Sequence, residues 1–110
     1  IGDRCLQEII KRSIPLLRKN DMLARYGGEE FVVIMPETDL EGAVQAAEKI
    51  RQTIEKISFL YKKETVKVTV SIGIAHARET DTTHKQIFER ADIAVYRAKE
   101  NGRNQVFVEK

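Results

Sequence analysis

The hydrophobic positions of the chain follow two periods, one helical and one alternating, and together they predict helices interleaved with strands. In the first segment, apolar residues recur at helical spacing from Cys5 to Leu17, and Asp3 just before it is a good helix N-cap. Pro15 is expected to kink or interrupt this helix, because proline removes a backbone donor and crowds the preceding turn. The first element is therefore predicted to be an interrupted helix.

Two further segments show the helical period. One is expected to begin near Thr38 or Asp39 as its cap, with an apolar face that runs from Leu40 to Ile57. The other is expected over residues 85–101, with Gly102 as its C-cap. Its inward positions are predicted to be Ile87, Phe88, Ala91, Ala94, Val95 and Ala98. No basic stripe interleaves with the aromatic residues, so five of them are expected to fill the core rather than stack on bases: Tyr26, Phe31, Phe88, Tyr96 and Phe107.

The remaining apolar segments have the pattern of strands. Residues 22–26 and 30–35 are expected to form a hairpin across Gly27 and Gly28, closed by Pro36. Residues 66–75 are expected to form one long strand buried on one face, in which Gly73 marks a close approach of the backbone. Residues 105–108 are expected to form a short final strand. This mixture predicts helices packed on a sheet, in an α/β or α+β layering.

Composition limits the class of protein without identifying it. A chain of 110 residues with 42% hydrophobic residues fits one compact domain. Nineteen basic and seventeen acidic side chains give a net charge of +2, too small to indicate a nucleic-acid or membrane surface. No apolar run approaches the ~18 residues that a spanning helix needs, and the first residues lack a signal-peptide pattern. The single cysteine, Cys5, cannot form an internal disulfide, which suits a reducing cytoplasm.

The most specific local pattern is the run Arg25-Tyr26-Gly27-Gly28-Glu29-Glu30-Phe31. A Gly-Gly turn can adopt positive φ and lets a bulky ligand approach the backbone. The two carboxylates that follow would face opposite ways on a strand, so only one is easily a ligand on a given face. From these residues alone, an ordinary hairpin turn and a turn that holds a divalent cation beside a phosphate both stay open.

Four other motifs occur in register with this turn: Gly2-Asp3, Arg18-Lys19-Asn20-Asp21, Ser71-Ile72-Gly73-Ile74-Ala75, and a final group from Ala91-Asp92 to Gly102-Arg103-Asn104. In this order and spacing, the chain resembles the GGDEF domain family, the diguanylate cyclases, in the variant whose signature is GGEEF. The resemblance covers essentially all of residues 1–110, as the C-terminal part of such a domain. It implies an α+β fold of the nucleotidyl-cyclase or palm-like type, with a central, mainly antiparallel sheet flanked by helices.

The resemblance implies that two GTP molecules are condensed into cyclic di-GMP, with release of pyrophosphate, where two identical domains meet. Mg²⁺ or Mn²⁺ would neutralise charge during this transfer. Glu29 matches the metal-binding carboxylate of the family, and Glu30 matches the neighbouring acid, as a second metal contact or a support for the turn. The alternative for Glu29 is a solvated turn carboxylate.

Five residues match substrate-binding positions of the family. Asp3 matches the acid that accepts hydrogen bonds from guanine, and its alternative role is helix capping. Gly27 and Gly28 would let the backbone approach the phosphates. Lys99 and Arg103 match the basic pair that holds the terminal phosphates, spaced one helical turn apart. The alternative for this pair is a charged helix end that is favourable to the macrodipole.

A second constellation lies ahead of the signature. Arg18 and Asp21 form an RxxD arrangement, which resembles the inhibitory site at which the family binds its product, cyclic di-GMP. Lys49 stands where a further basic residue often completes that site, and would be a weaker, monodentate substitute for arginine. A lone RxxD also occurs by chance at helix ends, with the aspartate as a turn former.

One departure from the family concerns the start of the sequence. In the family a strand and a helix precede the Gly-Asp motif, and the strand supplies a metal-binding aspartate. We therefore expect the 110-residue chain by itself to be inactive, with a gap or an exposed sheet edge where that strand belongs.

The partners implied by the resemblance are GTP, cyclic di-GMP, a second copy of the domain, and an upstream sensory or receiver domain. Nucleic acid and membrane contact by this domain are not expected. The expected location is the cytoplasm, or the cytoplasmic part of a membrane-anchored sensor. The alternative function is a non-catalytic regulatory module that binds GTP or cyclic di-GMP, and a generic ferredoxin-like interaction domain is a third.

Overall fold

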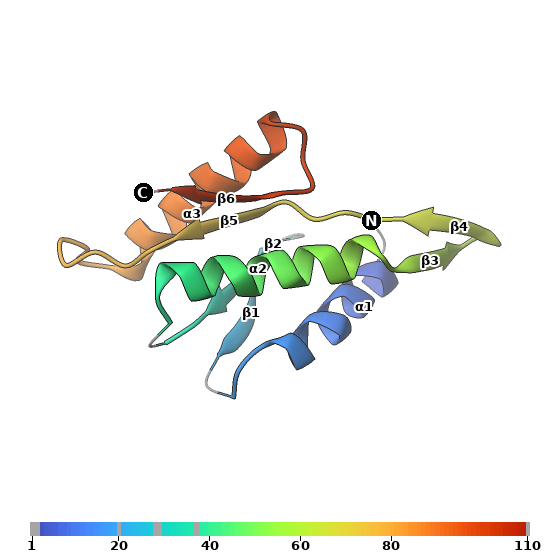
Figure 1. Cartoon of the computed structure of the whole chain (residues 1–110), viewed down its shortest axis with the longest axis horizontal. Helices are drawn as coiled ribbons and strands as arrows, with labels where there is room; N and C mark the ends of the chain where they lie inside the picture. Colours follow the sequence, from blue (N-terminus) through green and yellow to red (C-terminus); the bar gives the residue numbers. More distant parts are fainter. Residues whose placement is uncertain (1–2, 20, 28–29, 37, 110) are drawn as a thin grey trace.

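The computed structural model describes residues 3–19, 21–27, 30–36 and 38–109. Its helical elements are α1 (Asp3–Ser13), the short 3₁₀ helix η1 (Ile14–Leu16), α2 (Leu40–Glu55) and α3 (His84–Glu100). Its strands are β1 (Met22–Gly27), β2 (Glu30–Ile34), β3 (Ser58–Tyr61), β4 (Glu64–Lys67), β5 (Ile72–Ala75) and β6 (Val106–Glu109) (Figure 1). The α+β class expected from the sequence is confirmed.

The helix boundaries follow the local chemistry of the sequence. Helix α1 ends at Ser13, and the chain continues as η1 with Pro15 in its first turn, so the predicted interruption is confirmed. Helix α2 is capped by Asp39, whose Oδ1 accepts a hydrogen bond from Gly42 N at 2.8 Å. The predicted apolar face of α2 extends too far, because the helix ends at Glu55 and Ile57 lies beyond it.

Within the described residues, the strands pair in three two-stranded sheets rather than in the single central sheet that was expected. Strands β1 and β2 form the predicted antiparallel hairpin, with an irregularity between Arg25 and Gly27. Strands β3 and β4 form a second antiparallel hairpin, and β5 pairs with β6 in parallel. Among the described strands, the β1–β2 hairpin shares no ladder with β5 or β6. The expected gap or exposed edge at the position of a preceding strand stays a prediction.

The prediction of one long strand over residues 66–75 is wrong. Its first part belongs to β4, which pairs with β3, and its last part is β5, which pairs with β6. Val68 and Val70 are half-buried and Thr69 is exposed. The alternation of apolar and polar residues here therefore matches burial on one side only. Burial alone does not make a strand, because a strand also needs a partner for its backbone groups.

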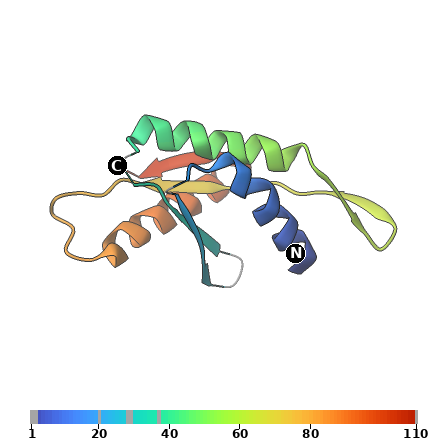
Figure 2. The same ribbon diagram turned by 90° about the horizontal axis from the view of Figure 1, so that it is seen from below.

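The β5–β6 pair lies between two helices. Helices α2 and α3 both pack against β5 and β6, and they cover opposite faces of the pair (Figures 1 and 2). Helix α1 packs against α2. The most buried apolar residues of the described part come from all three α-helices: Ile54, Ala94 and Ala98 are fully buried, and Ala47 and Leu6 are nearly so.

Small residues let α3 approach the sheet closely. A Cβ atom added at Gly73 on β5 would lie 2.3 Å from the carbonyl oxygen of Ala91 and 2.4 Å from the backbone nitrogen of Val95. The expected close approach at Gly73 is therefore confirmed. Helix α3 is held against β5 at a distance that only glycine permits.

Two expectations about side chains and membranes can also be compared with the structure. Tyr96 is 63% exposed, so its expected place in the core is wrong, whereas Phe88 and Phe107 are half-buried. The side chains of Tyr26 and Phe31 lie outside the described part of the chain. Within the described residues, no helix has the length and apolar character needed to cross a membrane.

Candidate functional site

The signature Gly27-Gly28-Glu29-Glu30 spans the connection from β1 to β2. In the ladder, Arg25 pairs with Phe31 and Gly27 pairs with Glu30, so the turn is the tip of an antiparallel hairpin. Gly28 and Glu29 lie outside the described residues, as does the side chain of Glu30. The hairpin thus provides two paired strands that end at the predicted metal site, and the roles of Glu29 and Glu30 stay predictions.

Asp3 is the first residue of α1. Its side chain lies outside the described part, so guanine binding and helix capping stay open as its roles. Among the residues that the structure describes, no group of three or more His, Cys, Asp or Glu side chains could hold a metal ion.

Lys99 and Arg103 occupy the end of α3 and the turn that follows it. Helix α3 ends at Glu100, close to the predicted end at Asn101, so Lys99 lies in its last turn and Arg103 lies beyond it. The joint binding of phosphate by the two residues stays a prediction. Gly102, Arg103 and Asn104 have φ angles of 108°, 63° and 50°, all in the left-handed region. Arg103 N donates to Ala98 O at 2.9 Å, which folds the turn back against the helix.

Lys99 lines a shallow depression on α3. Its other lining residues are Asp92, Val95 and Tyr96, and its volume is about 290 Å³. The side chain of Lys99 is exposed here. Sequence reasoning missed Asp92 and Tyr96 as neighbours of Lys99, although spacings of three, four and seven residues place all of them on one helix face.

The RxxD residues are brought together by a tight turn after η1. Arg18 N donates to Asp21 Oδ2 at 2.8 Å, and Asp21 N donates to Arg18 O at 3.0 Å. These reciprocal bonds use the backbone of Arg18, whose side chain is exposed. The turn therefore fixes the two residues side by side, and the bonds between them do not involve the guanidinium of Arg18.

The chain contains a second turn of the same kind. Arg78 N donates to Asp81 Oδ2 at 2.7 Å, and Asp81 N donates to Arg78 O at 2.9 Å. Here the carboxylate also accepts two bonds from Arg90, at 2.7 Å each, and Arg90 donates to His76 O at 2.8 Å. The Arg90 side chain and the Arg78 N–H lower the pKa of Asp81 to about 2. This second turn serves to fix the loop between β5 and α3.

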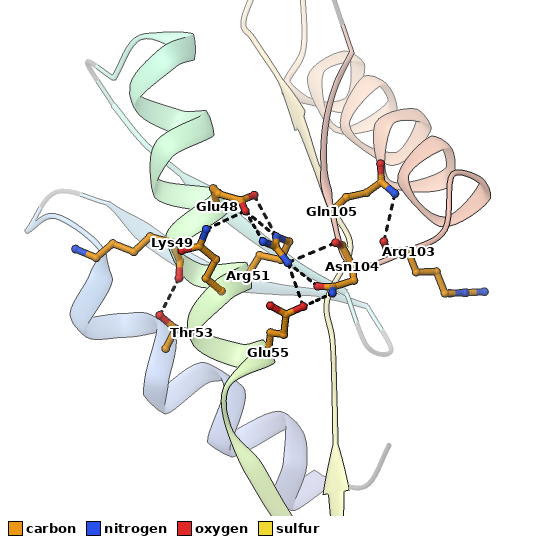
Figure 3. A network of polar contacts seen from close by, with 9 residues as sticks. Glu48, Lys49, Arg51, Thr53, Glu55, Arg103, Asn104 and Gln105 are labelled. Carbon is orange, nitrogen blue, oxygen red and sulfur yellow. Dashed lines mark hydrogen bonds and ion pairs between the residues drawn. The ribbon is translucent and has the colours of Figure 1, made fainter.

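Lys49 projects from α2, which packs against α1 and η1. The side chain of Lys49 is exposed and extends from the side of α2 opposite to Arg51 (Figure 3). Its proposed partnership with Arg18 and Asp21 stays a prediction.

Comparison with known proteins identifies the family. Residues 1–105 match the family model described as "Diguanylate cyclase, GGDEF domain". The chain therefore belongs to the GGDEF domain family of diguanylate cyclases, as its motifs predicted.

Its relatives include Diguanylate cyclase A of Treponema denticola, 41% identical over 109 residues, or 99% of this chain and 29% of that protein. Response regulator PleD of Caulobacter vibrioides is 43% identical over 108 residues, or 96% of this chain and 24% of that protein. The chain thus spans less than a third of the length of these curated relatives.

Solved structures show the same fold. The GGDEF domain of DgcB from Caulobacter crescentus, in complex with c-di-GMP, superposes with a TM-score of 0.91 at 29% identity, covering 98% of this chain and 64% of that chain. The active GGEEF domain of a diguanylate cyclase from Vibrio cholerae has a TM-score of 0.85 at 29% identity, covering 99% of this chain and 69% of that chain.

Proposed function

We propose that the protein is a diguanylate cyclase, which condenses two molecules of GTP into cyclic di-GMP and releases pyrophosphate. The observation that supports this most is the match of residues 1–105 to the diguanylate cyclase family. It is supported further by the two antiparallel strands that bracket the Gly-Gly-Glu-Glu turn and by the basic residues at the end of α3.

In this proposal, the residues of the chain bind and orient GTP. Asp3 accepts hydrogen bonds from the donor edge of guanine. Lys99 and Arg103 bind the terminal phosphates, since an ammonium and a guanidinium both form charge-assisted bonds with phosphate oxygens. Gly27 and Gly28 have no side chains to obstruct the approach of the phosphates to the backbone.

The carboxylates of Glu29 and Glu30 form a donor set of hard oxygens, which fits Mg²⁺ or Mn²⁺. A metal bound there supplies neutralisation of the phosphate charge. Two domains, each with one GTP, face each other so that each 3′-hydroxyl attacks the α-phosphate of the other nucleotide. A homodimer is therefore the active form, and an upstream sensory or receiver domain controls its assembly.

The proposal includes product inhibition. Arg18, Asp21 and Lys49 bind cyclic di-GMP, with the guanidinium of Arg18 directed to the O6 and N7 edge of guanine or to phosphate. The turn that fixes Arg18 beside Asp21 supports this role, because the bonds between the two residues use the backbone of Arg18 and not its guanidinium.

The test is GTP turnover with Mg²⁺, followed by chromatography for cyclic di-GMP, on the full-length polypeptide. Glu29→Ala is expected to abolish product while the circular dichroism spectrum stays unchanged, because it removes a metal-binding carboxylate. Glu29→Asp is the matched control, since it keeps the carboxylate and is expected to retain turnover. The 110-residue chain, assayed alongside, is expected to be inactive.

Each outcome separates the two candidate functions. Product in the wild type that disappears in Glu29→Ala establishes the cyclase and its metal site. Persistence of product in Glu29→Ala removes the metal assignment. Absence of product from the wild type, with cyclic di-GMP still bound, moves the assignment to the regulatory module that binds the nucleotide through Arg18 and Asp21.

A further inference from the structure

The turn after α3 has an unusual backbone for its sequence. Arg103 and Asn104 are not glycines, yet both have left-handed φ angles, directly after Gly102. Residues with a Cβ seldom adopt this conformation, and consecutive ones persist only where the surroundings hold them. Since Arg103 lies in this turn rather than on α3, the position of its guanidinium depends on whatever holds the turn.

The side chain of Asn104 ties the turn to α2. Its Oδ1 accepts a hydrogen bond from Arg51 Nη1 at 2.8 Å, and its Nδ2 donates to Glu55 Oε2 (Figure 3). The backbone nitrogen of Asn104 donates to Ser71 Oγ at 3.1 Å, just before β5. Both ends of the amide are thus bound to residues one helical turn apart on α2.

Arg51 is itself held in one orientation. Its Nε donates to both carboxylate oxygens of Glu48, at 3.0 and 3.1 Å, and its Nη2 also donates to Glu48. The Arg51 side chain is only 13% exposed. The hydrogen bond from the Arg51 side chain lowers the pKa of Glu48, and the same contact raises the pKa of Arg51. Both groups therefore stay charged at neutral pH. The guanidinium therefore offers a fixed donor to Asn104.

Arg51 does not point toward the predicted phosphate site. In Figure 3 the side chain of Arg103 extends away from α2, on the other side of the turn from Arg51 and Glu55. The turn is also bridged by Gln105, whose Nε2 donates to Asn101 O at 2.6 Å and to Arg103 O at 3.2 Å. Arg51 can therefore affect a ligand on Arg103 only through the turn.

We propose that Arg51 and Asn104 are positioning residues for substrate, which hold the left-handed turn so that Arg103 and Lys99 engage the terminal phosphates of GTP together. This inference rests on the proposed function, because it assumes that Arg103 binds those phosphates. When the bond between Arg51 and Asn104 is lost, the side chain of Arg103 is unaltered, but the turn that carries it relaxes. The guanidinium of Arg103 is then misplaced.

The test measures how strongly the terminal phosphates contribute to binding. The full-length polypeptide is titrated with an α,β-methylene analogue of GTP, which cannot be turned over, and with GMP, which lacks the β- and γ-phosphates. The readout is the ratio of the two affinities. A general loss of folded protein weakens the binding of both ligands to the same extent, and the ratio of their affinities stays unchanged.

The variants are chosen to change the turn with little change in charge. Arg51→Lys keeps the positive charge but loses the planar fork that bonds Glu48 and Asn104 at once. Asn104→Gly removes the side-chain bonds while still permitting the φ of 50°, so it serves if Arg51→Lys fails to fold. Gln45→Ala, at an exposed position on the same helix, is the control and is expected to leave the ratio unchanged.

Arg103→Ala is expected to lower the ratio by roughly tenfold or more, as for the loss of one charge-assisted contact. Arg51→Lys and Asn104→Gly are expected to lower it several-fold on their own, and to lower it no further when combined with Arg103→Ala. That lack of additivity would establish that they act through Arg103.

Two results would overturn the inference while the proposed function survives. In the first, Arg103→Ala lowers the ratio but Arg51→Lys and Asn104→Gly leave it unchanged. In the second, their effects add in full to that of Arg103→Ala. If Arg103→Ala itself leaves the ratio unchanged, the phosphate role of Arg103 fails, and the inference fails with it.

Discussion

Replacing Gly73 with alanine tests whether the close contact between β5 and α3 holds the fold together. The added Cβ would lie 2.3 Å from Ala91 O and 2.4 Å from Val95 N. Both atoms belong to the backbone of α3, so neither can be relieved by rotating a side chain. An ordinary contact needs a separation of at least about 3.4 Å, and α3 must therefore move by about 1 Å relative to β5.

The expected cost is at the upper end of the range for overpacking, about 3 kcal/mol. For a domain whose free energy of unfolding is roughly 5–15 kcal/mol, this is a large fraction of the total. Urea unfolding followed by circular dichroism measures the loss. Because α3 carries Lys99, the same shift should also weaken binding of GTP.

Gly42→Ala is the matched control. A Cβ at Gly42 would meet side chains rather than backbone, Asp39 Oδ1 at 3.0 Å and Thr38 Cγ2 at 3.1 Å. Asp39 Oδ1 also accepts the capping bond from Gly42 N, so a weakened cap of about 1 kcal/mol would offset the similar gain in helix propensity of alanine over glycine. The control is therefore expected to be near neutral. If Gly73→Ala unfolds within about 0.5 kcal/mol of the wild type, the contact with α3 is not what requires glycine, and the reasoning is refuted.

Two further predictions concern the paired turns of the RxxD type. Arg18→Ala is expected to raise the inhibition constant of cyclic di-GMP by at least about tenfold without lowering the initial rate, since it removes a charge-assisted contact. Arg78→Ala, in the second turn, should leave inhibition unchanged, and equal inhibition of both variants and the wild type would remove the product site. Asp81 has a pKa lowered from its ordinary 3.8 to about 2, so its ion pair stabilises the fold above the higher value and is lost as the pH falls toward the lower one. Thermal melts should therefore show the wild type losing its advantage over Asp81→Asn between these two pH values, and a constant difference would contradict the assignment.

Local patterns in the sequence predicted the elements whose causes are themselves local. The hairpin needed only a Gly-Gly pair between two apolar strands, and the start of α2 needed only Asp39 as a cap. The role of Gly73 was predictable because a glycine in a β-branched run indicates a close neighbour. The first two features depend on residues near one another in the chain, whereas Gly73 is recognised locally although its neighbours, Ala91 and Val95, are distant in sequence.

Features that depend on distant residues could not be predicted. The alternation from Val66 onward suggested one strand, but pairing assigned its two ends to different partners, β3 and β6. The end of α3 was predicted to within one residue, but the left-handed φ angles of Arg103 and Asn104 after it were not. The bonds from Arg51 and Glu55 to Asn104 join residues about half the chain apart, and no spacing rule predicts such bonds.

For the proposed site, the residues and the family could be predicted from the sequence. The structure showed the local backbone around them: the end of α3 and the turn after it for Lys99 and Arg103, and the turn after η1 for Arg18 and Asp21. It also showed that the RxxD spacing produces the same turn twice, at Asp21 and at Asp81. The spacing therefore specifies backbone geometry. Whether such a turn can bind a ligand also depends on the partners of its carboxylate. At Asp81 the carboxylate is already bonded to Arg90.

The parallel pairing of β5 with β6 has a consequence for the order of folding. The β1–β2 and β3–β4 hairpins each join neighbouring segments, so they can form by closing short loops. Strands β5 and β6 are separated in the sequence by α3 and the turn after it, so they can pair only when that segment has folded back. Such non-local pairing is slow. We therefore expect the segment that carries Lys99 and Arg103 to be among the last to reach its native arrangement, so that the proposed phosphate-binding residues would be in place only after the hairpins have formed.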